Sequence, residues 1–121
     1  MPHLTLEYSS NIREKENFHS LFHNLHHIIV RIAKADIESC KSRAIEHKTY
    51  YIGNGDLNGA FIHLKVQLLE GRPIQVRQEA GEEILKALAE HFSQSLTHLN
   101  LDITVEVAEI IKNLYFKKSK T

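Results

Sequence analysis

The chain has 121 residues, enough for one domain with a single hydrophobic core. Fifteen basic residues balance fifteen acidic ones, so no net field attracts nucleic acid or an anionic membrane, and we expect neither as a partner. The single cysteine, Cys40, excludes an internal disulfide and offers no metal-ligand spacing, which fits a reducing, cytoplasmic setting; we expect it to be a packed residue rather than a catalytic thiol. The sequence has no leader pattern and no apolar run near the roughly 20 residues that a membrane span needs.

The first half of the chain predicts a strand, a helix and a second strand. Residues 3–8 alternate as in a strand, and a polar break follows at 9–11. Apolar residues then recur at helical spacing, which predicts an amphipathic helix: Phe18, Leu21, Phe22, Leu25, Ile28, Ile29 and Ile32. Residues 42–49 are a second strand candidate. The glycine-rich segment 53–59 leads into a strand rather than a helix, so we interpret it as a connection and not as a phosphate-binding loop.

The second half repeats this order. Ile62, Leu64, Val66 and Leu68 predict a strand with one apolar face, and the turn at 71–73 ends it. Apolar residues from Val76 to Phe92 mark a second helix, and alternation over residues 101–107 predicts a fourth strand.

Two similar halves, about 1–58 and 59–121, predict one domain of the α/β class built from two tandem βαβ units. Their four strands would form one sheet with both helices on one face. We expect the other face to expose apolar side chains, because those of the strands cannot all point at the helices, and such a face predicts oligomerisation.

Pro2 is a candidate catalytic base. If Met1 is removed, the chain begins with a secondary amine on a rigid ring at the head of a strand. An ordinary N-terminal amine titrates near pH 8, and an apolar pocket lowers this pKa toward neutral pH, where a general base works best.

Arginines are the candidate anion-binding residues. Arg43 lies at the start of the second strand candidate with Lys41 close by, and Arg72 lies in the turn at 71–73. A guanidinium presents a fixed fork to a carboxylate, so these groups placed beside Pro2 would bind a polyanionic substrate.

The nine histidines predict no metal site. Four of them, His19, His23, His26 and His27, lie on the first helix, roughly opposite its apolar stripe, and we expect them to face solvent without a carboxylate or cysteine to complete a ligand set. We expect His3, His47 and His63 to be hydrogen-bonded strand residues.

Several segments, in order along nearly the whole chain, resemble the 5-carboxymethyl-2-hydroxymuconate isomerase family. They are the opening at 1–13, Lys41-Ser42-Arg43, Glu70-Gly71-Arg72, the run at 77–81, and the ending at 113–117, which is similar to the Leu-Asn-Phe-Lys ending of that family.

The resemblance implies a tautomerase-like fold, a homotrimer, and an N-terminal proline that transfers protons without a cofactor. Pro2 would then be the acid–base catalyst, and Arg43 and Arg72 would hold the carboxylates of an unsaturated substrate from homoprotocatechuate (4-hydroxyphenylacetate) degradation. Where this chain has Lys41, a member of that family has arginine, and lysine lacks the bidentate grip.

Two alternatives remain open at this stage. A dehalogenase or hydratase of the same fold, acting on small unsaturated acids, would also need a carboxylate to activate water, for which Glu7 is a candidate. A trimeric interaction module without activity would keep the fold alone. Genes for aromatic catabolism next to this one would favour the isomerase.

Overall fold

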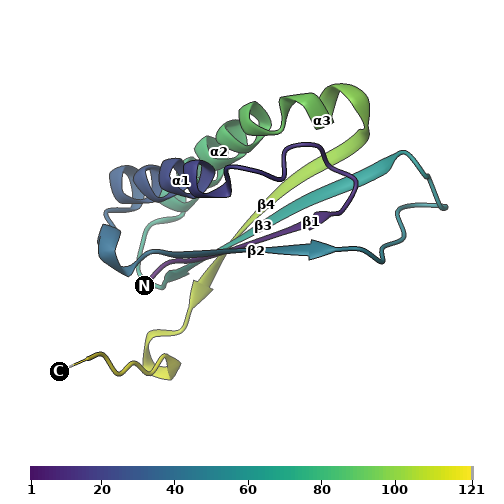
Figure 1. The fold of residues 1–121 in the computed structure, drawn as a ribbon. Helices are drawn as coiled ribbons and strands as arrows, with labels where there is room; N and C mark the ends of the chain where they lie inside the picture. Colours follow the sequence, from purple (N-terminus) through teal and green to yellow (C-terminus); the bar gives the residue numbers. More distant parts are fainter. Residues whose placement is uncertain (121) are drawn as a thin grey trace.

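Two long helices cover one face of a four-stranded sheet in the computed structural model, which describes residues 1–120 (Figure 1). The strands and helices are β1 (His3–Ser9), α1 (Phe18–Ala33), β2 (Lys41–His47), β3 (Gly59–Leu69), α2 (Ile74–His91), α3 (Ser93–His98) and β4 (Asn100–Ile110). Short 3-10 turns follow α1 at Ile37–Ser39 and β4 at Lys112–Leu114. No helix of residues 1–120 is long and apolar enough to cross a membrane.

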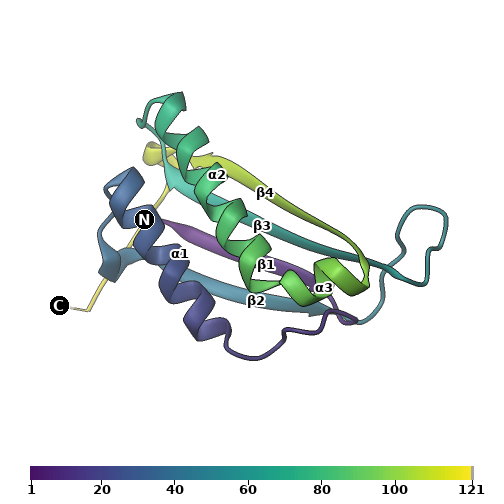
Figure 2. The same ribbon diagram turned by 90° about the horizontal axis from the view of Figure 1, so that it is seen from above.

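The sheet confirms the predicted pair of βαβ units. Its strand order is β2-β1-β3-β4, with β1 parallel to β2 and β3 parallel to β4. The two halves meet through the antiparallel pair of β1 and β3 at the centre of the sheet. Figure 2 shows α1 and α2 lying side by side across the strands. The first residues of β1 therefore lie near the middle of one end of the sheet.

The face turned away from the helices is polar, so the expected apolar open face was wrong. Alternate residues of β3, such as Ile62 and Leu64, are fully buried in the core. They pair in register with Ile103 and Val105 of β4, which pack against the same core. Because the apolar positions of neighbouring strands coincide, one layer of helices covers them all. The opposite face carries mainly polar side chains, among them His3, Thr5, Glu7, Arg43, His47, His63, Lys65, Gln67, Thr104 and Glu106.

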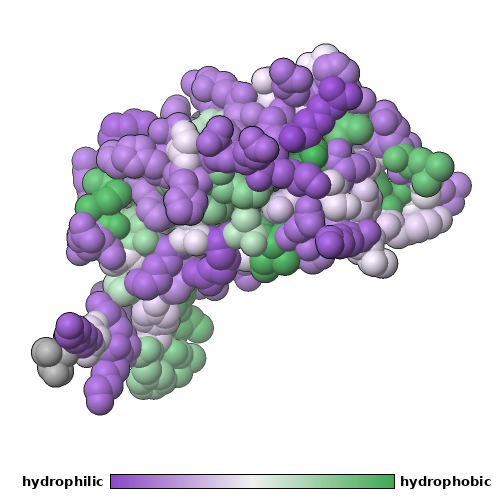
Figure 3. Space-filling model, in the orientation of Figure 1, coloured by the Kyte–Doolittle hydropathy of each residue, from purple (hydrophilic) through white to green (hydrophobic). Residues whose placement is uncertain are grey.

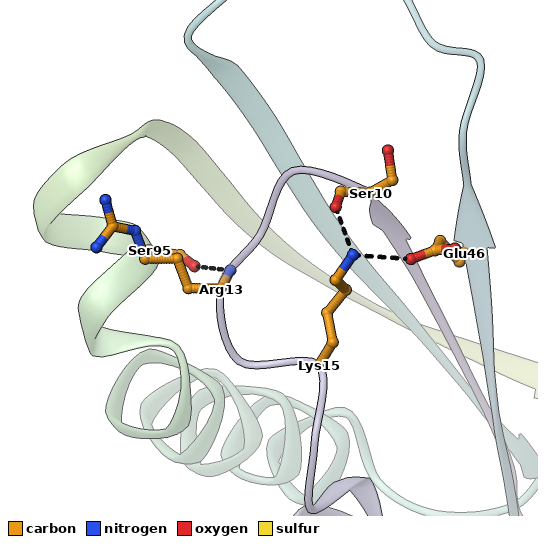
Figure 4. A network of polar contacts seen from close by, with 5 residues as sticks. All are labelled: Ser10, Arg13, Lys15, Glu46 and Ser95. Atoms are coloured by element: carbon orange, nitrogen blue, oxygen red, sulfur yellow. Dashed lines mark hydrogen bonds and ion pairs between the residues drawn. The ribbon is translucent and has the colours of Figure 1, made fainter.

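Long-range contacts produced an element that the sequence patterns did not predict. The helix α3 begins where the backbone N–H groups of Gln94 and Ser95 donate to the carboxylate of Glu14, 80 residues earlier in the chain. The same loop before α1 is tied down at other points (Figure 4): the Arg13 N–H donates to Ser95 Oγ at 2.9 Å, and Lys15 Nζ donates to the Ser10 carbonyl at 2.8 Å. A carboxylate at a helix N-terminus satisfies donors that have no partner within the helix.

Element boundaries differ slightly from the predicted ones. The second strand begins at Lys41 and ends at His47 rather than spanning 42–49, and β4 continues past Val107 to Ile110. The predicted turn at 71–73 is confirmed, with Gly71 at a φ of +122° between β3 and α2.

Candidate active site

Pro2 is held at the head of β1. It is buried, and its carbonyl accepts a hydrogen bond of 3.1 Å from the backbone N–H of Lys41, the first residue of β2. The next core residues of the strand, Leu4 and Leu6, are fully buried between the sheet and the helices. The start of the chain is therefore a fixed part of the sheet.

The N-terminal amine lies in a desolvated and electropositive setting. Burial lowers the pKa of the Met1 amine below its usual value, and the positive charges of Arg72, Lys117 and Lys41 lower it further. Both effects disfavour the ammonium form. An amine at this end of β1 therefore keeps a free lone pair at lower pH than an ordinary N-terminus does.

Arg72 is anchored beside this amine by backbone carbonyls. Its Nε donates to the carbonyl of Ala33 at the end of α1 at 2.7 Å, and its Nη1 donates to the carbonyl of Leu69 at 3.2 Å. A guanidinium has five N–H donors, so Nη2 and the second hydrogen of Nη1 are left for a ligand. The turn thus presents a rigid cation with donors to spare.

Lys41 and Arg43 lie on β2, and both are exposed. Lys41 contributes to the positive field at the amine. Arg43 instead donates from Nη2 to Nδ1 of His3 at 2.6 Å. The structure thus brings Arg72 and Lys41 to the amine, and it joins Arg43 to His3, the residue that follows Pro2.

The sequence patterns did not reveal two residues that contact the first residues of the chain. Lys117 Nζ lies 3.9 Å from the Met1 sulfur, and the Tyr115 hydroxyl lies 2.7 Å from Nε2 of His3. Both belong to the segment after β4, which lies on the side of the sheet away from the helices (Figure 1). The sequence pointed to them only through the family-like ending at 113–117, which does not show by itself that these residues contact the start of the chain.

Of the four helix histidines, His26 does not face solvent as expected. His19, His23 and His27 are exposed, but His26 is half-buried and its Nε2 lies 2.7 Å from the Ser42 hydroxyl. The reason is that α1 crosses β2, whose Ser42 lies on the helix-facing side of the sheet. Within residues 1–120, no group of three or more His, Cys, Asp or Glu side chains is arranged to hold a metal ion.

The strand histidines and Cys40 fit the structural roles predicted for them. His47 pairs with Glu7 at 2.8 Å, and His63 lies 2.7 Å from the Thr104 hydroxyl. The pairing occupies the one carboxylate that was considered for activating water. Cys40 is half-buried and packs against the core, and burial raises the pKa of its thiol, which favours the protonated form.

Residues 2–121 match the model of a family described as 5-carboxymethyl-2-hydroxymuconate isomerase. The chain belongs to this family. A 5-carboxymethyl-2-hydroxymuconate Δ-isomerase of Escherichia coli is 27% identical over 119 residues, covering 98% of this chain and 94% of that protein. The crystal structure of a 5-carboxymethyl-2-hydroxymuconate isomerase from Deinococcus radiodurans R1 is 26% identical with a TM-score of 0.89, covering 98% of this chain and 90% of the other.

The tautomerase-like fold is confirmed as well. A structure described as a fused 4-OT symmetric trimer has a TM-score of 0.73 at 16% identity, covering 92% of this chain and 87% of the other, and so shows the fold alone. Membership of an isomerase family makes the buried start of β1 and the cations around it candidates for a catalytic site.

Proposed function

We propose that this protein is a 5-carboxymethyl-2-hydroxymuconate Δ-isomerase that uses Pro2 as its acid–base catalyst. Membership of the isomerase family supports the activity. The observation that carries the site is the placement of Pro2, buried at the head of β1 where burial and Arg72 lower the pKa of an amine.

The reaction is a proton shift that leaves the composition of the substrate unchanged. After removal of Met1, the free amine of Pro2 takes a proton from the substrate, and the electron pair spreads over a dienolate. The protonated proline then returns the proton to a carbon at a distance along the conjugated system from the atom that lost it. A carbon–carbon double bond therefore moves, and the amine is regenerated. No cofactor takes part in these steps.

The cations supply the electrostatic part of this mechanism. Arg72 is fixed by two carbonyls before substrate arrives, so its free N–H groups bind a carboxylate or the dienolate oxygen without reorganisation. Arg43 and Lys41 are the proposed second and third anion-binding groups. With lysine at position 41, that contact is a point charge rather than a fork.

A homotrimer is part of the proposal, on grounds other than an apolar sheet face. The segment after β4 projects from the body of the molecule and displays an apolar patch (Figure 3). Ile111, Leu114 and Phe116 of this segment are 56%, 69% and 86% exposed. A second copy of the chain would cover such a patch, as symmetric trimers with this fold suggest. Light scattering tests it, and a monomer at micromolar concentration would refute the assembly.

The alternatives have less support. A hydratase or dehalogenase needs a free carboxylate near the amine, whereas Glu7 is engaged by His47 on the open face. A binding module without activity does not require a buried N-terminal proline surrounded by cations, so this arrangement favours an enzyme. The single cysteine continues to favour a cytoplasmic location, which we include in the proposal.

Intact mass combined with an isomerase assay tests the proposed mechanism. Active protein should lack Met1, and Pro2→Ala should lower kcat with no change in the melting temperature. The loss should stay below the full contribution of a positioned general base, about 10²- to 10⁴-fold, because alanine leaves a flexible primary amine where the rigid secondary amine of proline stood. The same enzyme made with Met1 retained should be inactive, because the proline nitrogen is then an amide. Full activity with Met1 attached would refute the role of Pro2.

A further inference from the structure

Three residues from distant parts of the chain form a continuous hydrogen-bonded chain on the open face of the sheet. Arg43 of β2 contacts Nδ1 of His3 at 2.6 Å, and Nε2 of the same imidazole contacts the Tyr115 hydroxyl at 2.7 Å. The two rings also meet edge to face, with centroids 6.0 Å apart. Since both ring nitrogens of His3 are engaged, its orientation is fixed from two sides.

The partners of His3 determine which nitrogen carries its proton. A guanidinium has only donors, so Nδ1 must accept from Arg43 and cannot itself be protonated. A neutral imidazole then carries its hydrogen on Nε2, which donates to the oxygen of Tyr115. The O–H of Tyr115 remains free to donate elsewhere. This arrangement permits one tautomer and no imidazolium.

The charges around His3 agree with this assignment. Burial and the positive charges of Arg43, Lys41 and the N-terminal amine lower the pKa of His3. The residue opposite it on β3 is the neutral Gln67, and the group reaching it from the C-terminal segment is the neutral Tyr115. His3 is therefore neutral at neutral pH, as its contact with Arg43 requires.

We propose that His3 and Tyr115 are positioning residues that hold the Arg43 guanidinium for a substrate carboxylate. The inference rests on the isomerase function proposed above. Tyr115 fastens His3 from the C-terminal segment, His3 accepts from one guanidinium nitrogen, and the remaining donors of Arg43 are left in a set direction. An exposed arginine on a strand otherwise has many rotamers, and restricting them lowers the entropy lost on binding.

The first test needs no substrate. ¹⁵N NMR of the free protein should show His3 as the Nε2–H tautomer at pH 7, and Arg43→Ala should raise the pKa of His3 and mix its tautomers. His63→Asn, on the same sheet face but bonded to Thr104, is the control and should leave His3 unchanged. An Nδ1–H tautomer for His3 in the native protein would overturn the proposal.

The second test uses two substitutions of His3 that differ in which contact they keep. Asn places its oxygen near the position of Nδ1 and keeps an acceptor for Arg43, whereas Gln reaches toward the position of Nε2 and loses it. We expect His3→Gln to raise KM by about two- to twelvefold, the range for one lost hydrogen bond, with kcat little changed. In a Tyr115→Phe background, where the contact that asparagine loses is already absent, His3→Asn should change KM less than His3→Gln does. Equal effects of the two substitutions in that background would contradict an acceptor role.

The pH dependence of KM separates positioning from a merely structural role. In native protein KM should rise as pH falls through the lowered pKa of His3, because a proton on Nδ1 displaces the Arg43 donor. In His3→Asn this rise should vanish, since the amide does not titrate. A native KM that stays flat through the His3 pKa measured by NMR would overturn the proposal.

A double-mutant cycle completes the test. Tyr115→Phe should raise KM severalfold in the native background and have no further effect in Arg43→Ala, because the hydroxyl acts through the arginine. Tyr51→Phe, in the exposed loop before β3, is the matched control. Additive effects would refute positioning. If the protein fails to isomerise the substrate at all, the proposed function fails, and the NMR result still decides whether the hydrogen-bonded chain holds Arg43.

Discussion

Replacing Arg72 by alanine tests the electropositive site most directly. The substitution removes two hydrogen bonds to backbone carbonyls, at 2.7 and 3.2 Å, and the charge that lowers the pKa of the N-terminal amine. At about 0.5–1.5 kcal/mol for each bond, the free energy of unfolding should fall by about 1–3 kcal/mol. Urea denaturation measures this loss separately from activity.

The effect of Arg72→Ala on catalysis should be of similar size in free energy, but it is measured separately. A charge-assisted contact to a substrate carboxylate contributes about 1.5–3 kcal/mol. Under conditions where Arg72→Ala is fully folded, kcat/KM should therefore fall by about 10- to 150-fold. Arg72→Lys should recover part of it, because the charge survives while the fork does not.

The pH profile carries the sign of the electrostatic effect. The positive charge of Arg72 disfavours the ammonium, so removing it should raise the pKa of the catalytic amine and move the acid limb of kcat/KM to higher pH. Arg31→Ala, an exposed arginine on α1, is the control and should leave both the limb and the efficiency in place. Full efficiency of Arg72→Ala toward a polycarboxylate substrate, with an unmoved acid limb, would refute the assignment.

Three further substitutions test the frame around the site. Glu14→Gln should lower the free energy of unfolding by about 1–2 kcal/mol at pH 7. Partial burial opposes the charged form of Glu14, but hydrogen bonds from Ser95 and Gln94 outweigh this effect and lower the pKa of its carboxyl group. The stabilisation by Glu14 is therefore complete above the pKa that this group has in the unfolded chain, and it is lost as pH falls through the lower pKa of the folded protein. In urea melts, the native protein and Glu14→Gln should then become equally stable. For His26, burial and then the neighbouring His27 and His23 lower the pKa; native stability should therefore decline as pH falls below about 6.5, and His26→Gln should show a shallower decline in pH-dependent thermal melts. Leu64→Ala, at a fully buried position of the central strand β3, should cost about 2–5 kcal/mol in denaturant unfolding, and a loss under 1 kcal/mol would contradict its place in the core.

Local patterns determined the elements of this protein and the positions of its reactive groups along the chain. Alternation in residues 62–68 and the helical spacing from Phe18 to Ile32 set the strand and the helix, because side-chain periodicity follows from backbone geometry alone. The backbone at position 71 has a positive φ, which glycine tolerates, and the glycine in the sequence therefore indicated a turn. Pro2 could be recognised as a candidate base because a proline directly behind Met1 becomes a free secondary amine once Met1 is removed.

Only the tertiary structure decided which faces and which partners these residues have. Strand periodicity says that alternate side chains share a face, but the register between β3 and β4 decided that the apolar faces coincide under the helices. His26 contacts Ser42 because α1 packs on the face of the sheet to which Ser42 points, and helical spacing alone does not predict this contact. The contact of His3 with Tyr115 spans 112 residues, and its hydrogen bond forms only because folding brings these two parts of the chain together at one end of the sheet.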